Sequence, residues 1–237
     1  MEERYIRTAM LIGEGGVEKL LNSKVIVIGV GGVGGYVTEA LARAGVGSLT
    51  LVDADTVAVS NINRQIIATL SSVGKSKVTA FAERIADINP DCTVSAVSEF
   101  ITPDNLCSLD LKNYDYVVDA IDTVSTKLAI AKLCEDEGIP LISSLGTGNK
   151  LDPTALKVTD IYKTSVCPLA RAMRTELKKL GVKHLKVVFS EETPIKPDEM
   201  LTARLSGGGK SVGSISFVPS AAGLIIASEV VRAIAGK

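Results

Sequence analysis

Residues 25–34 read Val25-Ile-Val-Ile-Gly-Val-Gly-Gly-Val-Gly34, and no other stretch says more about how this chain folds. The apolar run before Gly29 predicts a short strand buried on both faces, as at the centre of a parallel sheet. Gly29, Gly31, Gly32 and Gly34 follow in the pattern G-x-G-x-x-G, and the residues after Gly34 predict a helix. This order places a phosphate against backbone N–H groups at the positive end of a helix. The stretch therefore predicts a nucleotide-binding unit of Rossmann type.

Strands and helices alternate from this unit to residue 150, which predicts an α/β fold with a doubly wound parallel sheet. Beyond residue 150 we expect strands without regular helices between them, so the sheet becomes mixed in the C-terminal half. The expected strands are 24–29, 48–52, 93–97, 114–120, 139–143, 156–160, 186–190 and 213–217. The expected helices are 4–22, 34–44, 75–88 and 126–137, together with a short helix that Thr102-Pro103-Asp104 opens.

The 237 residues show no linker and no internal repeat, so we expect a single domain spanning 1–237. Within it, residues 22–150 form the nucleotide-binding core, and residues 151–237 form a substrate-side part that also completes a dimer. A hydrophobic content of 46% with 22% charged residues is typical of a globular protein.

The formal net charge of −1 excludes a global basic field and gives no reason to expect DNA binding. One local run, from Arg171 to Lys186, carries six basic residues against one acid. It is interpreted either as a solvated helix face or as a contact surface for the phosphates of tRNA.

Four cysteines occur without any C-x-x-C pair, which predicts reduced thiols in a cytoplasmic protein and no zinc site. Cys167 is a conceivable acyl acceptor, although a structural thiol is the simpler interpretation. The apolar segment 217–234 is interrupted by polar residues, which favours a buried or interface helix over a membrane span. A peripheral membrane contact of this segment stays open.

Charged and amide side chains follow the second predicted strand at positions suited to a nucleotide. Asp53 ends that strand, where a carboxylate accepts hydrogen bonds from ribose hydroxyls. Arg64 can grip two phosphate oxygens, and Lys77 supplies a point charge for a third. The other nucleotide-binding positions that we predict nearby are Asp55, Asn61 and Gln65.

Asp119 and Asp122 lie at the end of a later strand in the sequence Asp-Ala-Ile-Asp. Carboxylates at the carboxyl edge of a parallel sheet point into the ligand crevice, and Mg²⁺ takes one or two of them together with phosphate oxygens. We assign the metal to Asp122 and a supporting role to Asp119. The alternative is that they cap the following helix.

We assign no function to two further features of the sequence, a glycine-rich segment near residue 210 and the single histidine. Gly207-Gly-Gly-Lys-Ser211 looks like the end of a Walker A motif, but no strand feeds it, so a loop is expected. His184 is the only histidine and stands between lysines, which is typical of a surface residue.

Taken together, these residues resemble the ubiquitin-activating-enzyme-like adenylyltransferases. The resemblance rests on Arg4-Tyr-Ile-Arg7, the glycine loop, Asp53, Asn61-x-x-Arg64-Gln65, Lys77 and Asp122. It implies that these residues bind ATP and Mg²⁺, with Arg7, Arg64, Lys77 and Asp122 acting in catalysis. It also implies a homodimer in which Arg7 reaches into the ATP site of the partner subunit.

Within that family the chain resembles the branch of dehydratases that modify tRNA. The motifs are Arg7-Thr-x-x-Leu-x-Gly-Glu14, Asn89-Pro-x-Cys92, Phe100-Ile-Thr-Pro-Asp-Asn105, Asp152-Pro-Thr154 and Thr159-Asp160…Lys163-Thr164…Pro168-Leu-Ala170. The resemblance implies adenylation of the carboxylate of N6-threonylcarbamoyladenosine in tRNA, then ring closure that releases AMP. Accessory proteins that transfer sulfur or carry electrons stay open as partners.

Two alternatives also stay open. One is an adenylyltransferase that activates the C-terminal glycine of a small ubiquitin-like sulfur-carrier protein. The other is an NAD-binding oxidoreductase or a nucleotide-sensing module, since Asp53 alone suits either nucleotide.

Overall fold

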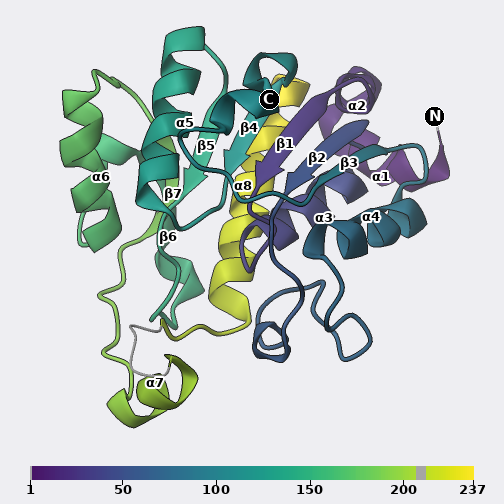
Figure 1. Ribbon diagram of the computed structural model, residues 1–237. Coiled ribbons are helices and arrows are strands. Elements are labelled where there is room, and N and C mark those ends of the chain that lie inside the picture. The colour runs from purple at the N-terminus through teal and green to yellow at the C-terminus, as the bar shows by residue number, and fades with distance from the viewer. Residues whose placement is uncertain (1, 207–211) are drawn as a thin grey trace.

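The computed structural model describes residues 2–206 and 212–237, and its centre is one seven-stranded sheet (Figure 1). The strand order is β3-β2-β1-β4-β5-β7-β6. All neighbours are parallel except the edge pair β7 and β6. The strands are β1 (Lys24–Ile28), β2 (Ser48–Val52), β3 (Thr93–Val97), β4 (Tyr116–Asp119), β5 (Leu141–Ser144), β6 (Leu156–Asp160) and β7 (Lys186–Ser190). This confirms the predicted fold class, including a mixed C-terminal half.

Helices cover both faces of the sheet (Figure 1). Val25 and Val27 of β1 pack in the hydrophobic cluster of α3, α4 and α8, whereas Ile26 and Ile28 pack in that of α5. The alternation follows from the side-chain period of two in a strand. The helices are α1 (Glu3–Ile12), α2 (Glu14–Leu21), α3 (Gly34–Ala44), α4 (Lys77–Ile88), α5 (Val124–Glu137), α6 (Pro168–Lys179), α7 (Glu199–Ser206) and α8 (Phe217–Ala235).

The structure corrects three expected elements. The lead-in helix is two helices, because Gly13 lies between them with φ +79°. Helix α6 occupies the connection between β6 and β7, where we expected no regular helix. The expected strand 213–217 is absent; Phe217 instead begins α8, and Pro219 stands in its first turn, where the missing N–H costs nothing. The Walker-like segment 207–211 lies outside the described residues.

Helix α8 is long and apolar enough to cross a membrane by length and composition. In this fold it instead crosses one face of the sheet and buries Val218, Ala222, Ile226 and Val230 against α3 and the strands (Figure 1). One face of α8 therefore belongs to the core of the domain, as expected for a buried helix, while Phe217 and Leu224 stay 42% and 51% exposed.

Candidate nucleotide-binding site

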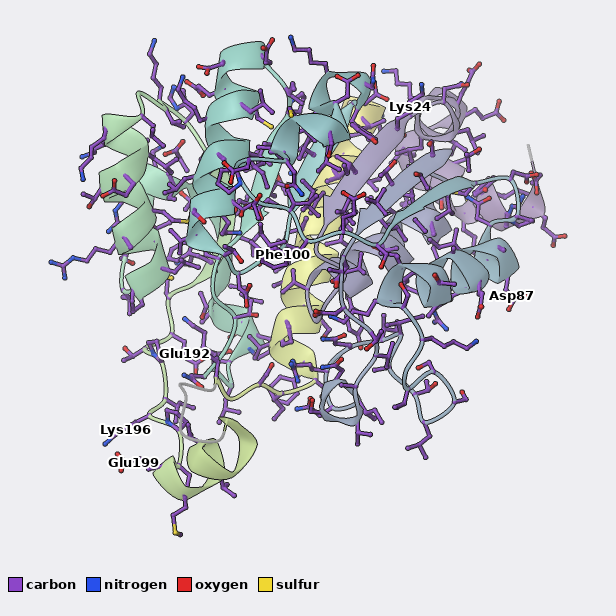
Figure 2. The ribbon with its side chains drawn as sticks, viewed as in Figure 1. Lys24, Asp87, Phe100, Glu192, Lys196 and Glu199 are labelled. Carbon is purple, nitrogen blue, oxygen red and sulfur yellow. The ribbon has the colours of Figure 1, made fainter. Side chains whose placement is uncertain are left out.

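A cavity of about 490 Å³ lies at the carboxyl edge of the sheet. The glycine loop, the loops after β2, β3, β4 and β5, and the beginning of α8 all line it. Helices α3 and α5 begin at this edge, so their N-terminal N–H groups lie on the same side as the cavity. Figure 2 labels Phe100 at this edge and Lys24 at the opposite one. The arrangement is suited to an anionic ligand.

The glycine loop is packed too closely for side chains. A Cβ on Gly34 would lie 1.8 Å from the carbonyl oxygen of Gly29. Gly29 has φ +87°, and a Cβ there would lie 2.9 Å from the carbonyl oxygen of Ala120. Gly31 and Gly32 line the cavity, and the nearest atoms to a Cβ on them belong to Gln65 and Pro219. The loop backbone can therefore approach a ligand directly.

Asp53 is held in place by its surroundings. Its Oδ2 accepts from the backbone N–H of Val30 at 2.9 Å, and its Oδ1 accepts from that of Asp55 at 2.9 Å. Lys77 is buried, with Nζ 2.7 Å from Asp55 Oδ2 and 3.5 Å from Asp53 Oδ1. The structure thus brings these three predicted residues together, in one hydrogen-bonded group on the cavity wall.

The 3₁₀ turn η1 (Val59–Asn61) and the residues after it supply the next wall. Asn61 caps this turn by accepting from the N–H of Ala58 at 3.0 Å. Arg64 lines the cavity, half-buried, with Nη1 2.8 Å from the carbonyl oxygen of Ser60. Gln65 is buried in the lining, and its Oε1 has no hydrogen-bond partner among the described residues. An acceptor left in this state is expected where a ligand donates.

The two aspartates of the Asp-Ala-Ile-Asp segment are placed differently. Asp122 is exposed on the cavity wall, and its carboxylate has no hydrogen bond or ion pair within the described part of the chain. Asp119 does not line the cavity. It is 1% exposed and forms a buried ion pair with Lys127. Of these two aspartates, Asp122 therefore has the carboxylate free for a metal ion bound to a nucleotide.

Arg7 does not line the cavity of its own chain. It is exposed on α1, and the neighbouring Tyr5 packs against Gly45 and hydrogen-bonds Asn89, at the edge where the strands begin. The sequence-predicted site residues thus line the cavity at the carboxyl edge, apart from Arg7 and the buried Asp119, which ends β4 behind the lining. Gly34 is also outside the lining but sets the shape of the loop.

Several lining residues were not predicted from the sequence. Segment 144–148 follows β5 and contributes Ser144, Thr147 and the small Gly146 and Gly148. The glycines of this segment, directly after a predicted strand, were the available signal. Phe100 is 63% exposed on the loop after β3 and also lines the cavity (Figure 2).

The four cysteines are free thiols, and no group of three metal-ligating His, Cys, Asp or Glu side chains occurs in residues 2–206 and 212–237. Burial raises the pKa of Cys134 to about 12 and that of Cys92 to about 11, so both remain neutral thiols. Cys167 is buried at the beginning of α6.

The basic run from Arg171 to Lys186 is divided by the structure. Arg174 donates to Thr164, Lys179 pairs with Glu176, and Lys186 pairs with Glu229. Arg171 and Lys183 are exposed without an ion pair in the described residues, and exposed Lys178 lies over the Tyr162 ring. About half of the run is therefore available to a ligand.

The strand, the glycine turn and the carboxyl-edge cavity define a Rossmann-type nucleotide-binding protein. More narrowly, the chain belongs to the ThiF family, whose model matches residues 4–237.

Two relatives within this family match nearly the whole length of this chain, and a third matches about three fifths of it. The tRNA threonylcarbamoyladenosine dehydratase of Bacillus subtilis is 44% identical and covers 98% of this chain and 94% of its own length. The crystal structure of the E. coli tRNA N6-threonylcarbamoyladenosine dehydratase in complex with ATP superposes with a TM-score of 0.88 at 37% identity, covering 99% of this chain and 94% of that one. The molybdopterin-synthase adenylyltransferase of Salmonella typhimurium is 39% identical but covers only 59% of this chain and 57% of its own.

Proposed function

We propose that this protein is an ATP-dependent dehydratase that acts on N6-threonylcarbamoyladenosine in tRNA. A carboxylate oxygen of the substrate attacks the α-phosphorus of ATP, which forms an acyl adenylate and releases pyrophosphate. A nitrogen or oxygen of the same side chain then attacks the activated carbonyl carbon and expels AMP. In total the substrate loses the elements of one water molecule, which appear in the conversion of ATP to AMP and pyrophosphate.

The observation that carries the proposal is full-length similarity to such dehydratases, joined to a cavity with the chemistry that adenylation needs. Arg64 and Lys77 stabilise charge that develops on the phosphates, and Asp53 binds the ribose. Because ring closure is intramolecular, positioning replaces a protein nucleophile. A buried Cys167 with no assigned role agrees with this scheme.

Magnesium fits the site through Asp122. Its carboxylate is exposed to the cavity and unpaired in the described residues, and Mg²⁺ prefers one or two carboxylates together with phosphate oxygens. A bound Mg²⁺ would neutralise charge on the phosphates. In this proposal Asp122 holds the ion, and Arg64 and Lys77 bind phosphate oxygens.

The test is a reaction of the purified protein with tRNA that carries the modification and with ATP. We expect AMP and pyrophosphate in equal amounts and a nucleoside product lighter by one water in the mass spectrum. No AMP and no mass change, with the relative from Bacillus subtilis active in parallel, would refute the proposal.

Activation of a sulfur-carrier protein is the less supported function. The molybdopterin-synthase adenylyltransferase shares only about three fifths of either chain. That function requires ATP–pyrophosphate exchange that depends on a protein ending in Gly-Gly and is indifferent to tRNA. An NAD-binding function requires NAD, and not Mg-ATP, to raise the melting temperature.

We further propose that exposed basic residues on and after α6 contact the tRNA backbone. Arg171, Lys178 and Lys183 are exposed and unpaired with acids within the described chain, and Leu169 of the same helix reaches the cavity. Phosphate contacts of this kind weaken steeply with salt, so tRNA affinity is expected to fall as salt rises.

A homodimer is the remaining part of the proposal. Arg7 lies outside the cavity of its own chain, and Met10 and Leu11 next to it on α1 are 77% and 84% exposed. An apolar helix face beside an arginine that has no ion pair in residues 2–206 and 212–237 suits a contact with a second copy. A mixture of Arg7→Ala and Asp122→Ala subunits is expected to regain part of the activity, because one of two shared sites is intact. No recovery in mixed dimers of demonstrated composition would exclude Arg7 acting across the interface.

A further inference from the structure

A fully buried ion pair lies beneath the cavity without touching it. Asp119 ends β4 and Lys127 stands on α5, with Lys127 Nζ 2.8 Å from Asp119 Oδ2 and side chains only 0% and 1% exposed. Removing two charges from water offsets most of their attraction, so a pair at this depth is weak evidence for fold stability alone. Its contacts indicate what it does instead.

The pair holds the peptide that leads into Asp122. Lys127 Nζ donates to the carbonyl oxygen of Ile121 at 3.1 Å, and Asp119 Oδ1 accepts from the N–H of Ile121 at 3.3 Å. Ser143 donates to Asp119 Oδ2 at 2.6 Å and so fixes that carboxylate from β5. The backbone N–H and carbonyl of Ile121 are therefore both hydrogen-bonded to a fully buried ion pair.

The same segment supports the glycine loop. The N–H of Ala120 donates to the carbonyl oxygen of Ile28 at 2.8 Å, and Gly29 lies directly against the carbonyl of Ala120. Movement of the 120–122 segment would thus move both Asp122 and the turn that contains Gly29.

We propose that Asp119 and Lys127 are a positioning pair that holds the Asp122 carboxylate where it meets the magnesium ion of Mg-ATP. The proposal rests on the use of Mg-ATP in the proposed function. It changes the role predicted for Asp119 from a ligand-binding residue to one that acts through Ile121 and Asp122.

The test measures nucleotide affinity by calorimetry in two variants, Lys127→Met and Lys127→Met with Asp119→Asn. Loss of a residue that orients a metal ligand is expected to weaken Mg-ATP binding about 10- to 100-fold. Affinity for ATP in EDTA is expected to fall less than affinity for Mg-ATP, because without the ion only a shift of the Gly29 turn acts on binding. The double variant leaves no unpaired charge buried, so its melting temperature should be higher than that of Lys127→Met. It still lacks the hydrogen bond from Lys127 to Ile121, so its affinity for Mg-ATP should stay weakened.

Arg84→Met is the matched control, since it breaks the ion pair between Arg84 of α4 and Glu39 of α3, away from the cavity lining. It should lower the melting temperature but leave the ratio of the affinities for Mg-ATP and metal-free ATP as in the wild type. Equal weakening of Mg-ATP and metal-free ATP, or wild-type Mg-ATP binding in the double variant, would overturn the positioning role. A wild-type protein that binds Mg-ATP more tightly than ATP in EDTA but does not convert tRNA would refute the proposed function and leave this comparison valid. A wild type without that magnesium preference would overturn the pair's role.

Discussion

The two edges of the sheet each carry a hollow, and the larger one lies at the edge without the glycine loop. The hollow at the amino edge measures about 670 Å³ and is lined by the C-terminal ends of α2 and α8 and by the residues before β4 and β5. The cavity at the carboxyl edge measures about 490 Å³. Its walls contain the first residues of helices, the glycine loop and Asp122, whose carboxylate has no partner among the described residues.

The difference teaches that the lining residues and the direction of the strands and helices, and not the volume of the hollow, identify the nucleotide site. Parallel strands all point their carboxyl ends to one edge, so helix N-termini and their unpaired N–H groups collect there. Helix C-termini collect at the other edge and disfavour anions. Tyr116 at that edge is buried, and burial raises its pKa to about 12, so it stays neutral.

The largest effect that tests this comparison is expected at the carboxyl edge. Asp122→Ala and Arg64→Ala should each lower kcat/KM for the tRNA reaction about 10²- to 10³-fold. The first would remove the ligand proposed for the magnesium ion, and the second removes a cation that stabilises negative charge on the phosphates. Lys19→Ala, in the lining of the amino-edge hollow, should leave kcat/KM within about twofold. A strong loss from Lys19→Ala would mean that the larger hollow takes part in the reaction.

One glycine at each edge of the sheet, Gly34 in the glycine loop and Gly15 in the lining of the amino-edge hollow, gives a second test. Gly34→Ala places a Cβ 1.8 Å from the Gly29 carbonyl oxygen, so it should displace the loop, abolish ATP-induced stabilisation and cost several kcal/mol in the free energy of unfolding, on the order of 3. Gly15→Ala meets nothing within 4 Å and lies in α2, so it should raise stability by about 0.5–1 kcal/mol. Thermal melts with and without Mg-ATP measure both effects, and a tolerated Gly34→Ala would contradict the packing described here.

A third test extends the comparison to the exposed basic residues on and after α6, which run from Arg171, two residues after the cavity-lining Leu169, to Lys183, just before β7. Arg171→Ala and Lys183→Ala should each weaken tRNA binding modestly and reduce the salt slope of log K by about 1, as expected for one lost phosphate contact. Lys24→Ala at the amino edge should leave the slope unchanged. The measurement is a filter-binding titration at several salt concentrations. Equal slopes in all three variants would mean that tRNA does not contact Arg171 and Lys183.

The smallest effect concerns the flank of the sheet, away from both hollows. Burial alone would raise the pKa of Glu39, but hydrogen bonds from Arg84 and Arg43 outweigh it and hold that pKa below the usual 4.5. A carboxyl pKa lowered on folding contributes stability above the unfolded value, and that contribution is lost as pH falls through the folded value. Glu39→Gln should therefore cost about 1 kcal/mol at pH 7, and the difference from wild type should shrink below pH ~4. Urea unfolding at the two pH values measures it; a difference that grows in acid would reverse the assignment.

Most of the carboxyl edge could be predicted because its signals are local. The glycine loop and Asp53 directly follow strand ends, and Arg64 stands in the connection after β2; strand ends of one parallel sheet meet at one edge. Asp119 could not be separated from Asp122 in this way. Asp119 is the last residue of β4 and Asp122 follows it three residues later; the ion pair with Lys127, eight residues after Asp119, holds Asp119 away from the cavity.

The C-terminal part depended more on long-range contacts. The alternation in 213–217 suggests a strand, but the tertiary fold uses Phe217 as the first residue of a helix that covers the sheet. Likewise, six basic residues in a short run look equivalent until Arg174, Lys179 and Lys186 find partners within the chain.

The sequence by itself determined the strand–glycine turn–helix unit, the parallel α/β class and the set of residues able to bind a triphosphate, because these follow from periodicity and from chemistry a few residues apart. Only the tertiary structure decided which hollow is lined by that chemistry, which aspartate stays free for a metal ion, and that Arg7 lies outside its own cavity. Those outcomes depend on contacts between segments far apart in the chain, where burial and charge pairing select among side chains that look alike in the sequence.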